Sequence, residues 1–321
     1  MSERIHVTTP FPESALRRLR ERFEVRTGDT GSPGETERLA RAAAESTALI
    51  TYLTDRIDET IIAKGVGLKI VANYGAGYNN IDVAAARQRG IYVTNTPGVL
   101  HETTADLTWA LLLGAARQVV PADRYTRQGR FTGWRADLFL GHDVHGRTLG
   151  VIGCGEIGRA VARRAAGFRM RVLYTQRHRL SEETERALNA EFVPLETLLR
   201  ESDFVTLHVP LTQETHHLIG EKELALMKPT AYLIHAARGR VVDDRALVAA
   251  LKAGRIAGAG LDVYEQEPAL TEGMSELDNL LLLPHIGSAS HATRERMAHL
   301  VVDNVLDALE GREPRSLVPG W

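Results

Sequence analysis

The sequence is poor in cysteine and nearly balanced in charge. Cys154 is the single cysteine among 321 residues, so an internal disulfide framework and a zinc site built on several cysteines are both excluded. The formal net charge of −2 provides no basic surface of the kind that binds nucleic acid. No apolar run approaches the roughly 18 residues of a membrane span, and the N-terminal sequence has no signal-peptide core. We therefore expect a cytoplasmic protein that binds neither nucleic acids nor membranes.

What the sequence does contain is a regular alternation of strand-like and helix-like segments. β-branched runs such as RIHVTT and IYVTNTPG alternate with amphipathic segments such as ESALRRLRERF and IDVAAARQRG. This order is typical of α/β domains with parallel sheets. At about 150 residues per domain, the length predicts two domains.

The alternation is interrupted once and then resumes. One long helix is predicted from TTADLTWALLLGAARQ into ADRYTRQG, followed by a linker rich in glycine and aromatic residues, FTGWRADLFLGHDVHG. A second alternating series begins at TLGVIGCGEIG, and the chain ends in a predicted helix, SHATRERMAHLVVDNVLDALEG. The second α/β unit is therefore expected to be inserted before the final helix.

A glycine-rich turn opens the second series. In GVIGCGEIG, Gly153, Gly155 and Gly158 have the G-x-G-x-x-G spacing of dinucleotide-binding turns. The first glycine permits a tight turn, the second lets the backbone approach a pyrophosphate, and the third allows a helix to pack closely on a strand. The N-terminus of the following helix would present N–H groups and the positive end of its dipole to the phosphates. A structural turn without a ligand is the alternative.

The segment after the next strand lacks the acid that such sites usually carry. An Asp or Glu about 20 residues beyond the glycines commonly holds the adenosine ribose, but RVLYTQRHRL offers Gln176, Arg177 and Arg179 instead. An acid would repel a 2′-phosphate, whereas either guanidinium could bind it in a charge-assisted pair. The sequence thus predicts NADP(H) as the preferred cofactor, with NAD(H) possible. Alternatively, the two arginines are solvated loop charges.

Ionisable residues follow three later strand-like segments. Arg238 lies in HAARGRVVDD, Asp262 and Glu267 lie in GLDVYEQEP, and His285 lies in LLLPHIGSAS. Ligands of open α/β sheets bind beyond the carboxyl ends of the strands, so these groups can converge on one cleft. The other histidines lack H-E-x-x-H spacing, and we predict no metal site.

In these motifs the chain resembles the D-isomer-specific 2-hydroxyacid dehydrogenases. NYGAGYNNID, GVIGCGEIG, HAARGRVVDD, GLDVYEQEP and PHIGSAS occur in the family's order and approximate spacing, over nearly the whole chain. Within the family it is most similar to the glyoxylate/hydroxypyruvate reductases. The resemblance implies two doubly wound parallel-sheet α/β domains. These would be a flavodoxin-like substrate-binding domain over 1–98 and 289–321, and a Rossmann NAD(P)-binding domain over 99–288.

The resemblance also implies roles for the ionisable residues. His285 would act as the general acid that protonates the carbonyl oxygen as hydride reaches the carbon, and Glu267 would hydrogen-bond His285 and favour its protonated form. Arg238 would hold the substrate carboxylate and polarise the carbonyl. Asp262 would orient the nicotinamide carboxamide, and His235 occupies a position where the family often has Asn.

Further contacts with substrate and cofactor are implied in the same way. The backbone N–H groups of Ala76 and Gly77 would bind the substrate carboxylate, and Ser288 would lie near the substrate. The implied cofactor contacts are Thr104, Gly153, Gly155, Glu156, Ile157, Gly158, Gln176, Arg177, Arg179, Val209, Pro210, Ala236, Asp262 and Gly287.

The resemblance implies a homodimer and a small 2-oxo acid as the substrate. Glyoxylate or hydroxypyruvate fits best, while 2-ketogluconate and other substrates of D-2-hydroxyacid dehydrogenases stay open. Because this branch uses the linker as a dimer arm, Trp134 would either reach the site of the other subunit or pack as a buried side chain. A dinucleotide-sensing regulator, like the C-terminal-binding-protein corepressors, is the alternative from another functional class.

Overall fold

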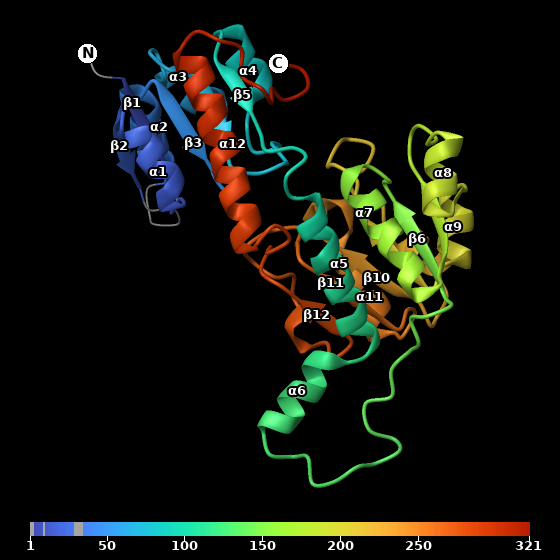
Figure 1. Ribbon diagram of the computed structural model, residues 1–321. Helices are drawn as coiled ribbons and strands as arrows, with labels where there is room; N and C mark the ends of the chain where they lie inside the picture. Colours follow the sequence, from blue (N-terminus) through green and yellow to red (C-terminus); the bar gives the residue numbers. More distant parts are fainter. Residues whose placement is uncertain (1–2, 9, 29–34) are drawn as a thin grey trace. The chain divides into compact units, whose positions relative to one another are not determined.

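The computed structural model describes residues 3–8, 10–28 and 35–321, and they form two compact units (Figure 1). The first unit comprises Met1–Leu100 and Ser288–Trp321, whereas the second is His101–Gly287. Each unit contains one sheet in which every described strand pairing is parallel. The prediction of two parallel-sheet α/β domains is therefore confirmed.

The sheet of the first unit has five strands in the order β2-β1-β3-β4-β5. This is the flavodoxin-like order 2-1-3-4-5 that the resemblance implied. β3 and β4 are buried along their whole length, as expected for a parallel sheet covered on both faces. The strands are β1 Arg4–Val7, β2 Glu24–Thr27, β3 Ala48–Thr51, β4 Ile70–Asn73 and β5 Tyr92–Thr94.

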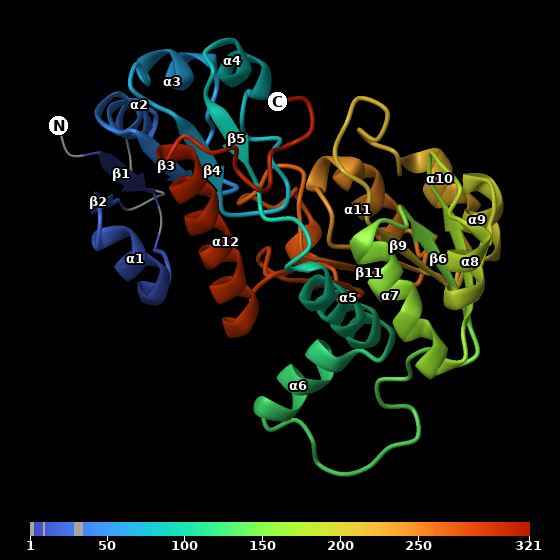
Figure 2. The same ribbon diagram turned by 45° about the horizontal axis from the view of Figure 1, so that its top comes forward.

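Helices cover both faces of this sheet. Those on one face, α2, α3 and α4, contribute Leu39, Ile61 and Ala86 to a shared core. On the other face α12 packs on the central strands beside α1 (Figure 2). Arg18 of α1 forms an ion pair with Asp303 of α12. The helices are α1 Glu13–Arg20, α2 Glu35–Glu45, α3 Glu59–Lys64, α4 Val83–Gln88 and α12 His291–Leu309.

The C-terminal segment completes the first unit. Val318 N donates a hydrogen bond to Val93 O at 3.0 Å, and Trp321 Nε1 donates to Ile91 O at 2.5 Å. The first unit is thus built from two segments that lie on either side of the second unit in the sequence.

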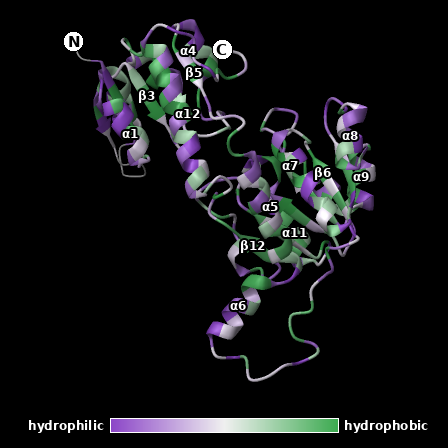
Figure 3. Cartoon of the chain, in the orientation of Figure 1, coloured by the Kyte–Doolittle hydropathy of each residue, from purple (hydrophilic) through white to green (hydrophobic). Residues whose placement is uncertain are grey.

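The sheet of the second unit has seven strands in the order β12-β11-β10-β9-β6-β7-β8. Starting from β8, six strands follow the Rossmann order 3-2-1-4-5-6, and β12 adds a seventh. The short edge strand β8 had no counterpart among the predicted segments. Figure 3 shows hydrophobic colour on strands of this sheet, while the surrounding helices carry both hydrophobic and hydrophilic colour. The strands are β6 Thr148–Ile152, β7 Arg171–Thr175, β8 Ala190–Phe192, β9 Phe204–Leu207, β10 Tyr232–His235, β11 Gly258–Leu261 and β12 Leu280–Leu282.

Two hydrophobic cores lie against this second sheet. α5 and α7 contribute Trp109 and Val161 to one of them, while α9, α10 and α11 contribute Leu198, Leu224 and Leu247 to the other. The helices are α5 His101–Ala116, α6 Val119–Arg127, α7 Glu156–Ala165, α8 Glu182–Leu188, α9 Leu195–Glu201, α10 Glu221–Leu226 and α11 Asp244–Lys252, with 3-10 turns η1 Ala166–Phe168, η2 Gly239–Val241 and η3 Met274–Glu276.

The prediction of one long helix between the two series is wrong. α5 ends at Ala116 and α6 begins at Val119, and Gln118 between them has a left-handed φ of 51°. Pro121 has no N–H, and its ring clashes with the carbonyl four residues earlier, so a straight helix cannot pass through it. α6 buries no side chain, and together with the segment 128–143 it projects from the rest of the second unit (Figures 1 and 2).

Candidate active site

Glycine is required at two positions of the turn between β6 and α7. Gly153 adopts a left-handed φ of 89°, and a Cβ there would lie 2.7 Å from His208 O. At Gly158 a Cβ would lie 2.1 Å from Gly153 O, so α7 can approach the strand this closely only with glycine. A Cβ on Gly155 would meet no atom within 4 Å. The space beside Gly155, at the start of α7, can therefore take the pyrophosphate of a dinucleotide.

Gln176 links the glycine turn to the loop after β7. Its Oε1 accepts a hydrogen bond from Cys154 N at 2.9 Å, and its Nε2 donates to His178 O at 2.6 Å. A neutral amide thus stands where dinucleotide sites usually have an acid, and it places no negative charge beside a 2′-phosphate. Burial raises the pKa of the Cys154 thiol to about 11, so this thiol is protonated and not a nucleophile.

Arg179 is held by a neighbouring acid. Its Nε and Nη2 donate to Glu185 Oε1 and Oε2 at 2.8 and 2.9 Å, in a bidentate pair. Tyr174 OH also donates to Glu185, at 2.6 Å, and accepts from Leu180 N. Arg179 and Tyr174 together hold the pKa of Glu185 at about 2. Arg177 is exposed, and no hydrogen bond or ion pair joins it to another residue in the described part of the chain.

His285 and Glu267, which we call the acid pair, form a hydrogen bond beyond β12 and β11. His285 Nδ1 lies 2.7 Å from Glu267 Oε2, and Tyr264 N donates to Glu267 Oε1 at 3.0 Å. Burial would raise the pKa of Glu267, but the hydrogen bond and charge of His285 outweigh it and keep this pKa below its ordinary value. His285 also has a left-handed φ of 55°, which non-glycine residues seldom adopt. With Nδ1 engaged, Nε2 is the nitrogen that can exchange a proton with a ligand.

Arg238 lies beyond β10, in the turn that leads to α11. Its Nη1 donates to Ala237 O at 2.7 Å, and His235 Nε2 donates to Arg238 O at 2.9 Å. Burial lowers the pKa of His235 to about 4, so this imidazole is neutral at physiological pH. Burial also lowers the pKa of Arg238, whereas the charge of Glu267 raises it. The guanidinium therefore interacts electrostatically with Glu267, which in turn binds His285, so the three groups can act on one ligand.

Asp262 binds the last two residues of the second unit. Its Oδ1 accepts from Ile286 N and its Oδ2 from Gly287 N, both at 2.7 Å. Burial raises the pKa of Asp262, and these N–H groups and the charge of His285 oppose the shift. Thr104 lies beside Gly287, because a Cβ on that glycine would be 3.4 Å from Thr104 Cγ2. The structure thus brings three of the predicted cofactor residues together, and each oxygen of Asp262 keeps a second lone pair for a carboxamide.

In the first unit, two buried asparagines fix the loop after β4. Asn95 Nδ2 donates to Ala76 O and Asn73 Nδ2 donates to Gly77 O, each at 2.6 Å. Neither the N–H of Ala76 nor that of Gly77 donates a hydrogen bond to another described residue. Two backbone donors are therefore held in place and are available to an anion. Ser288 begins the segment that returns to this unit.

Comparison with known proteins identifies the family of the chain. Residues 109–287 match the family model for the D-isomer specific 2-hydroxyacid dehydrogenase, NAD binding domain. A glyoxylate reductase of Pyrococcus horikoshii is 53% identical to the chain, over 99% of this chain and 96% of the relative. The chain belongs to the D-isomer specific 2-hydroxyacid dehydrogenase family. The resemblance found in the sequence is thereby confirmed.

Two solved structures are similar to this dehydrogenase along its whole length. The TT0316 protein from Thermus thermophilus has a TM-score of 0.92 at 47% identity, over 98% of this chain and 99% of that one. An NADPH-dependent glyoxylate/hydroxypyruvate reductase from Sinorhizobium meliloti, in complex with NADP and malonate, has a TM-score of 0.86 at 33% identity, over 99% and 97% of the two chains.

The remaining predicted cofactor residues of the dehydrogenase lie around the glycine turn and the next strand ends. Glu156 and Ile157 begin α7, and Val209 packs against the first glycine of the turn. Pro210 follows Val209 beyond β9, and Ala236 follows β10. In the described ranges, no group of three or more His, Cys, Asp and Glu could hold a metal ion, and no helix has the length and apolar character of a membrane span.

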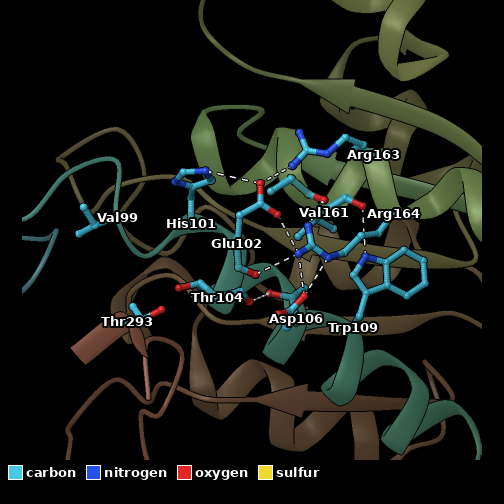
Figure 4. Close-up of polar contacts among 12 residues, drawn as sticks. Val99, His101, Glu102, Thr104, Asp106, Trp109, Val161, Arg163, Arg164 and Thr293 are labelled. Carbon is cyan, nitrogen blue, oxygen red and sulfur yellow. Dashed lines mark hydrogen bonds and ion pairs between the residues drawn. The ribbon is translucent and has the colours of Figure 1, made fainter. Parts of the chain in front are cut away.

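An ion-pair network that the sequence analysis missed joins α5 to α7 (Figure 4). Arg164 Nη2 lies 2.7 Å from Asp106 Oδ1 and 2.8 Å from Glu102 Oε2, and Arg163 pairs with the same glutamate. α5 carries Thr104, and α7 starts at the glycine turn. The network therefore joins two helices that carry predicted cofactor-binding residues.

Sequence reasoning also missed three residues that support the site: Glu185, Asp244 and Tyr264. Glu185 lies outside every motif and is recognisable only by its spacing from Arg179 across the start of α8. Asp244 and Tyr264 lie within quoted motifs, where they were not distinguished from their neighbours. The sequence carried one signal: Asp243 is sufficient to cap α11, so the second aspartate beside it needs another explanation.

Proposed function

We propose that the chain is an NADP(H)-preferring reductase that converts a small 2-oxo acid into the D-2-hydroxy acid. The observation that carries this proposal is the 2.7 Å contact between His285 Nδ1 and Glu267 Oε2 beyond the sheet of the Rossmann unit. Glyoxylate and hydroxypyruvate are the favoured substrates, because a glyoxylate reductase and a glyoxylate/hydroxypyruvate reductase are among the relatives. The relatives do not favour the dinucleotide-sensing regulator.

The second unit has the features that a nicotinamide dinucleotide requires. The open space at Gly155 and the start of α7 suit its pyrophosphate, and Thr104 and Asp262 suit its nicotinamide end. Bound NADPH supplies the hydride for the reaction. Arg177 would bind the 2′-phosphate in a charge-assisted pair, because Arg179 is already bound to Glu185.

The chain's own residues would supply the proton and hold the substrate. As hydride reaches the carbonyl carbon, His285 Nε2 would donate its proton to the carbonyl oxygen, which becomes the hydroxyl of the product. Glu267 would hold Nδ1 and stabilise the imidazolium before the transfer. Arg238 would bind the substrate carboxylate and polarise the carbonyl. In the first unit, the N–H groups of Ala76 and Gly77 would be the backbone donors for a substrate carboxylate.

We further propose a homodimer formed through the projecting arm, defined as α6 and the segment 128–143. Phe131, Trp134 and Leu140 on this arm are 54, 85 and 69% exposed. Large exposed apolar patches mark protein–protein contacts, and these three exposed side chains lie on one segment of the arm. Trp134 would then lie against the second copy of the chain.

The proposal is tested by mixing the purified protein with NADPH and a panel of 2-oxo acids and following the absorbance of the reduced cofactor. Specificity constants for glyoxylate and hydroxypyruvate, each with NADPH and with NADH, would rank substrates and cofactors. A His285→Ala variant should bind NADPH normally and lose most turnover. Absence of turnover with every acid in the panel, or full activity of His285→Ala, would contradict the proposal.

A further inference from the structure

A buried acid lies behind the segment that carries Glu267. Asp244, the first residue of α11, is 1% exposed. Its Oδ2 accepts hydrogen bonds from Glu265 N at 3.0 Å and from Thr271 Oγ1 at 3.1 Å. These two donors lie on either side of Glu267 in the sequence. One carboxylate oxygen therefore binds both ends of the segment 265–271.

Tyr264 connects this segment to both members of the acid pair. Its backbone N donates to Glu267 Oε1 at 3.0 Å. Its OH donates to Leu283 O at 2.6 Å, two residues before His285. A displacement of the segment would therefore move Glu267 and the backbone before His285 together.

The segment is closely packed at its beginning. A Cβ on Gly239 would lie 1.7 Å from Tyr264 O, so the two backbones are in direct contact. The side chain of Glu265 turns to His217, with its Oε1 3.0 Å from Nε2, and does not bind Glu267. The backbone N–H of Glu265, by contrast, donates to the carboxylate of Asp244.

We propose that Asp244 is a positioning residue for the acid pair, which fixes the segment 265–271 so that Glu267 meets His285 Nδ1. This inference rests on the proposed function of that pair. Burial raises the pKa of Asp244, the charges of Glu265 and Asp243 act in the same direction, and the two hydrogen-bond donors oppose them. Asp244 has acidic neighbours and no cationic partner among these groups, so it acts through its hydrogen bonds.

The experiment compares Asp244→Ala with Asp243→Ala. The control residue is the neighbouring acid on the same helix, which caps α11 by accepting from Ala246 N at 3.0 Å. We expect Asp244→Ala to lower kcat about tenfold, a smaller effect than the roughly hundredfold loss that a full 1 Å misplacement of a catalytic group can cause. KM and the Kd for NADPH should change little. Asp244→Asn should recover part of the activity, because its amide oxygen has two lone pairs and can accept both hydrogen bonds that Oδ2 accepts in the wild type.

The pH profile separates positioning from a purely structural role. In Asp244→Ala, a displaced Glu267 loses the stabilising contact with His285. The pKa of Glu267 then rises, and the acid limb of kcat/KM moves to higher pH. Asp243→Ala should leave this limb in place even if it lowers the Tm. If Asp244→Ala does not fold, Thr271→Val removes one of the two hydrogen bonds and should shift the limb by a smaller amount.

Hydrogen exchange provides a readout that does not depend on turnover. Amides of the segment 265–271 should exchange faster in Asp244→Ala than in the wild type or Asp243→Ala. If no 2-oxo acid is reduced by the wild type, the proposed function fails, while this exchange still decides whether Asp244 holds the segment. Equal exchange and an unshifted acid limb in the two alanine variants would overturn the inference.

Discussion

Glu185 binds Arg179 through both of its carboxylate oxygens, at 2.8 and 2.9 Å, whereas Arg177 forms no hydrogen bond or ion pair with another residue in the described part of the chain. We therefore predict different effects for two single variants. Arg177→Ala should raise the Kd for NADPH by about tenfold to a hundredfold, the value of one hydrogen-bonded charge pair, with little change for NADH. Arg179→Ala should weaken both cofactors slightly, because it only loosens the loop after β7. Fluorescence titration measures the Kd of each variant for NADPH and for NADH.

Glu185→Gln provides the control for this difference. It weakens the hold on Arg179 without touching Arg177, so the ratio of NADPH to NADH affinity should change far less than in Arg177→Ala. A larger loss of NADPH affinity in Arg179→Ala than in Arg177→Ala would mean that Arg179 leaves Glu185 to bind the phosphate.

The second prediction concerns the charge of Glu267 and its pH dependence. The pKa of this carboxyl lies below its ordinary value of 4.5, so its contribution to stability is present above the unfolded pKa and is lost as the pH falls through the lowered pKa. Glu267→Gln should remove this loss and should lower kcat/KM about a hundredfold, the scale of acid–base catalysis. Acid unfolding curves and pH–rate profiles of the wild type and of Glu267→Gln provide the measurement. Unchanged profiles would contradict a role for the charge.

The third prediction separates two glycines of the turn. In Gly158→Ala the new methyl group would lie 2.1 Å from Gly153 O, so we expect a loss of about 1–3 kcal/mol or more in the free energy of unfolding. In Gly155→Ala the methyl group meets no protein atom within 4 Å, and φ is −74°, so stability should be retained. NADPH affinity should nevertheless fall, because the methyl group fills the space of the pyrophosphate. Thermal unfolding and cofactor titration distinguish the two, and unchanged affinity in Gly155→Ala would place the pyrophosphate elsewhere.

The fourth prediction concerns the arm. Replacing Phe131, Trp134 and Leu140 together by serine should shift the protein from dimer to monomer in light scattering coupled to size exclusion. Val66, which is 86% exposed on the first unit, provides the matched control as Val66→Ser. The proposed dimer interface would be wrong if the triple variant has the same mass as the wild type.

Features that depend on a few neighbouring residues could be predicted from the sequence. The turn at Gly153 is an example, because the left-handed φ and the close approach of Gly158 follow from glycine at a fixed spacing. The strand-like runs also alternated in a way that predicts parallel sheets. The prediction of the long helix was wrong because Pro121, which has no N–H, blocks a straight helix.

Contacts between distant residues could not be predicted in the same way. The sequence does not distinguish Arg177 from Arg179, because both are arginines in the same loop. Only the folding of α8 brings Glu185 to Arg179. Asp244 and Glu265 are separated by 21 positions, and their hydrogen bond depends on the way η2 and the loop after β11 pack. Strand order likewise depends on the pairing of whole strands.

The bonds of Val318 to β5 and of Trp321 to Ile91 have a consequence for the order of synthesis. The ribosome completes the second unit before α12 and the C-terminal segment exist, and domains generally fold as units as they emerge. Until α12 is synthesised, the first hundred residues therefore lack the helix that covers the central strands on one face of their sheet. A nascent chain stalled near Gly287 would contain the complete second unit and a first unit without α12 and the C-terminal segment. The exposed apolar strands of that first unit would make the chain a substrate for chaperones and proteases.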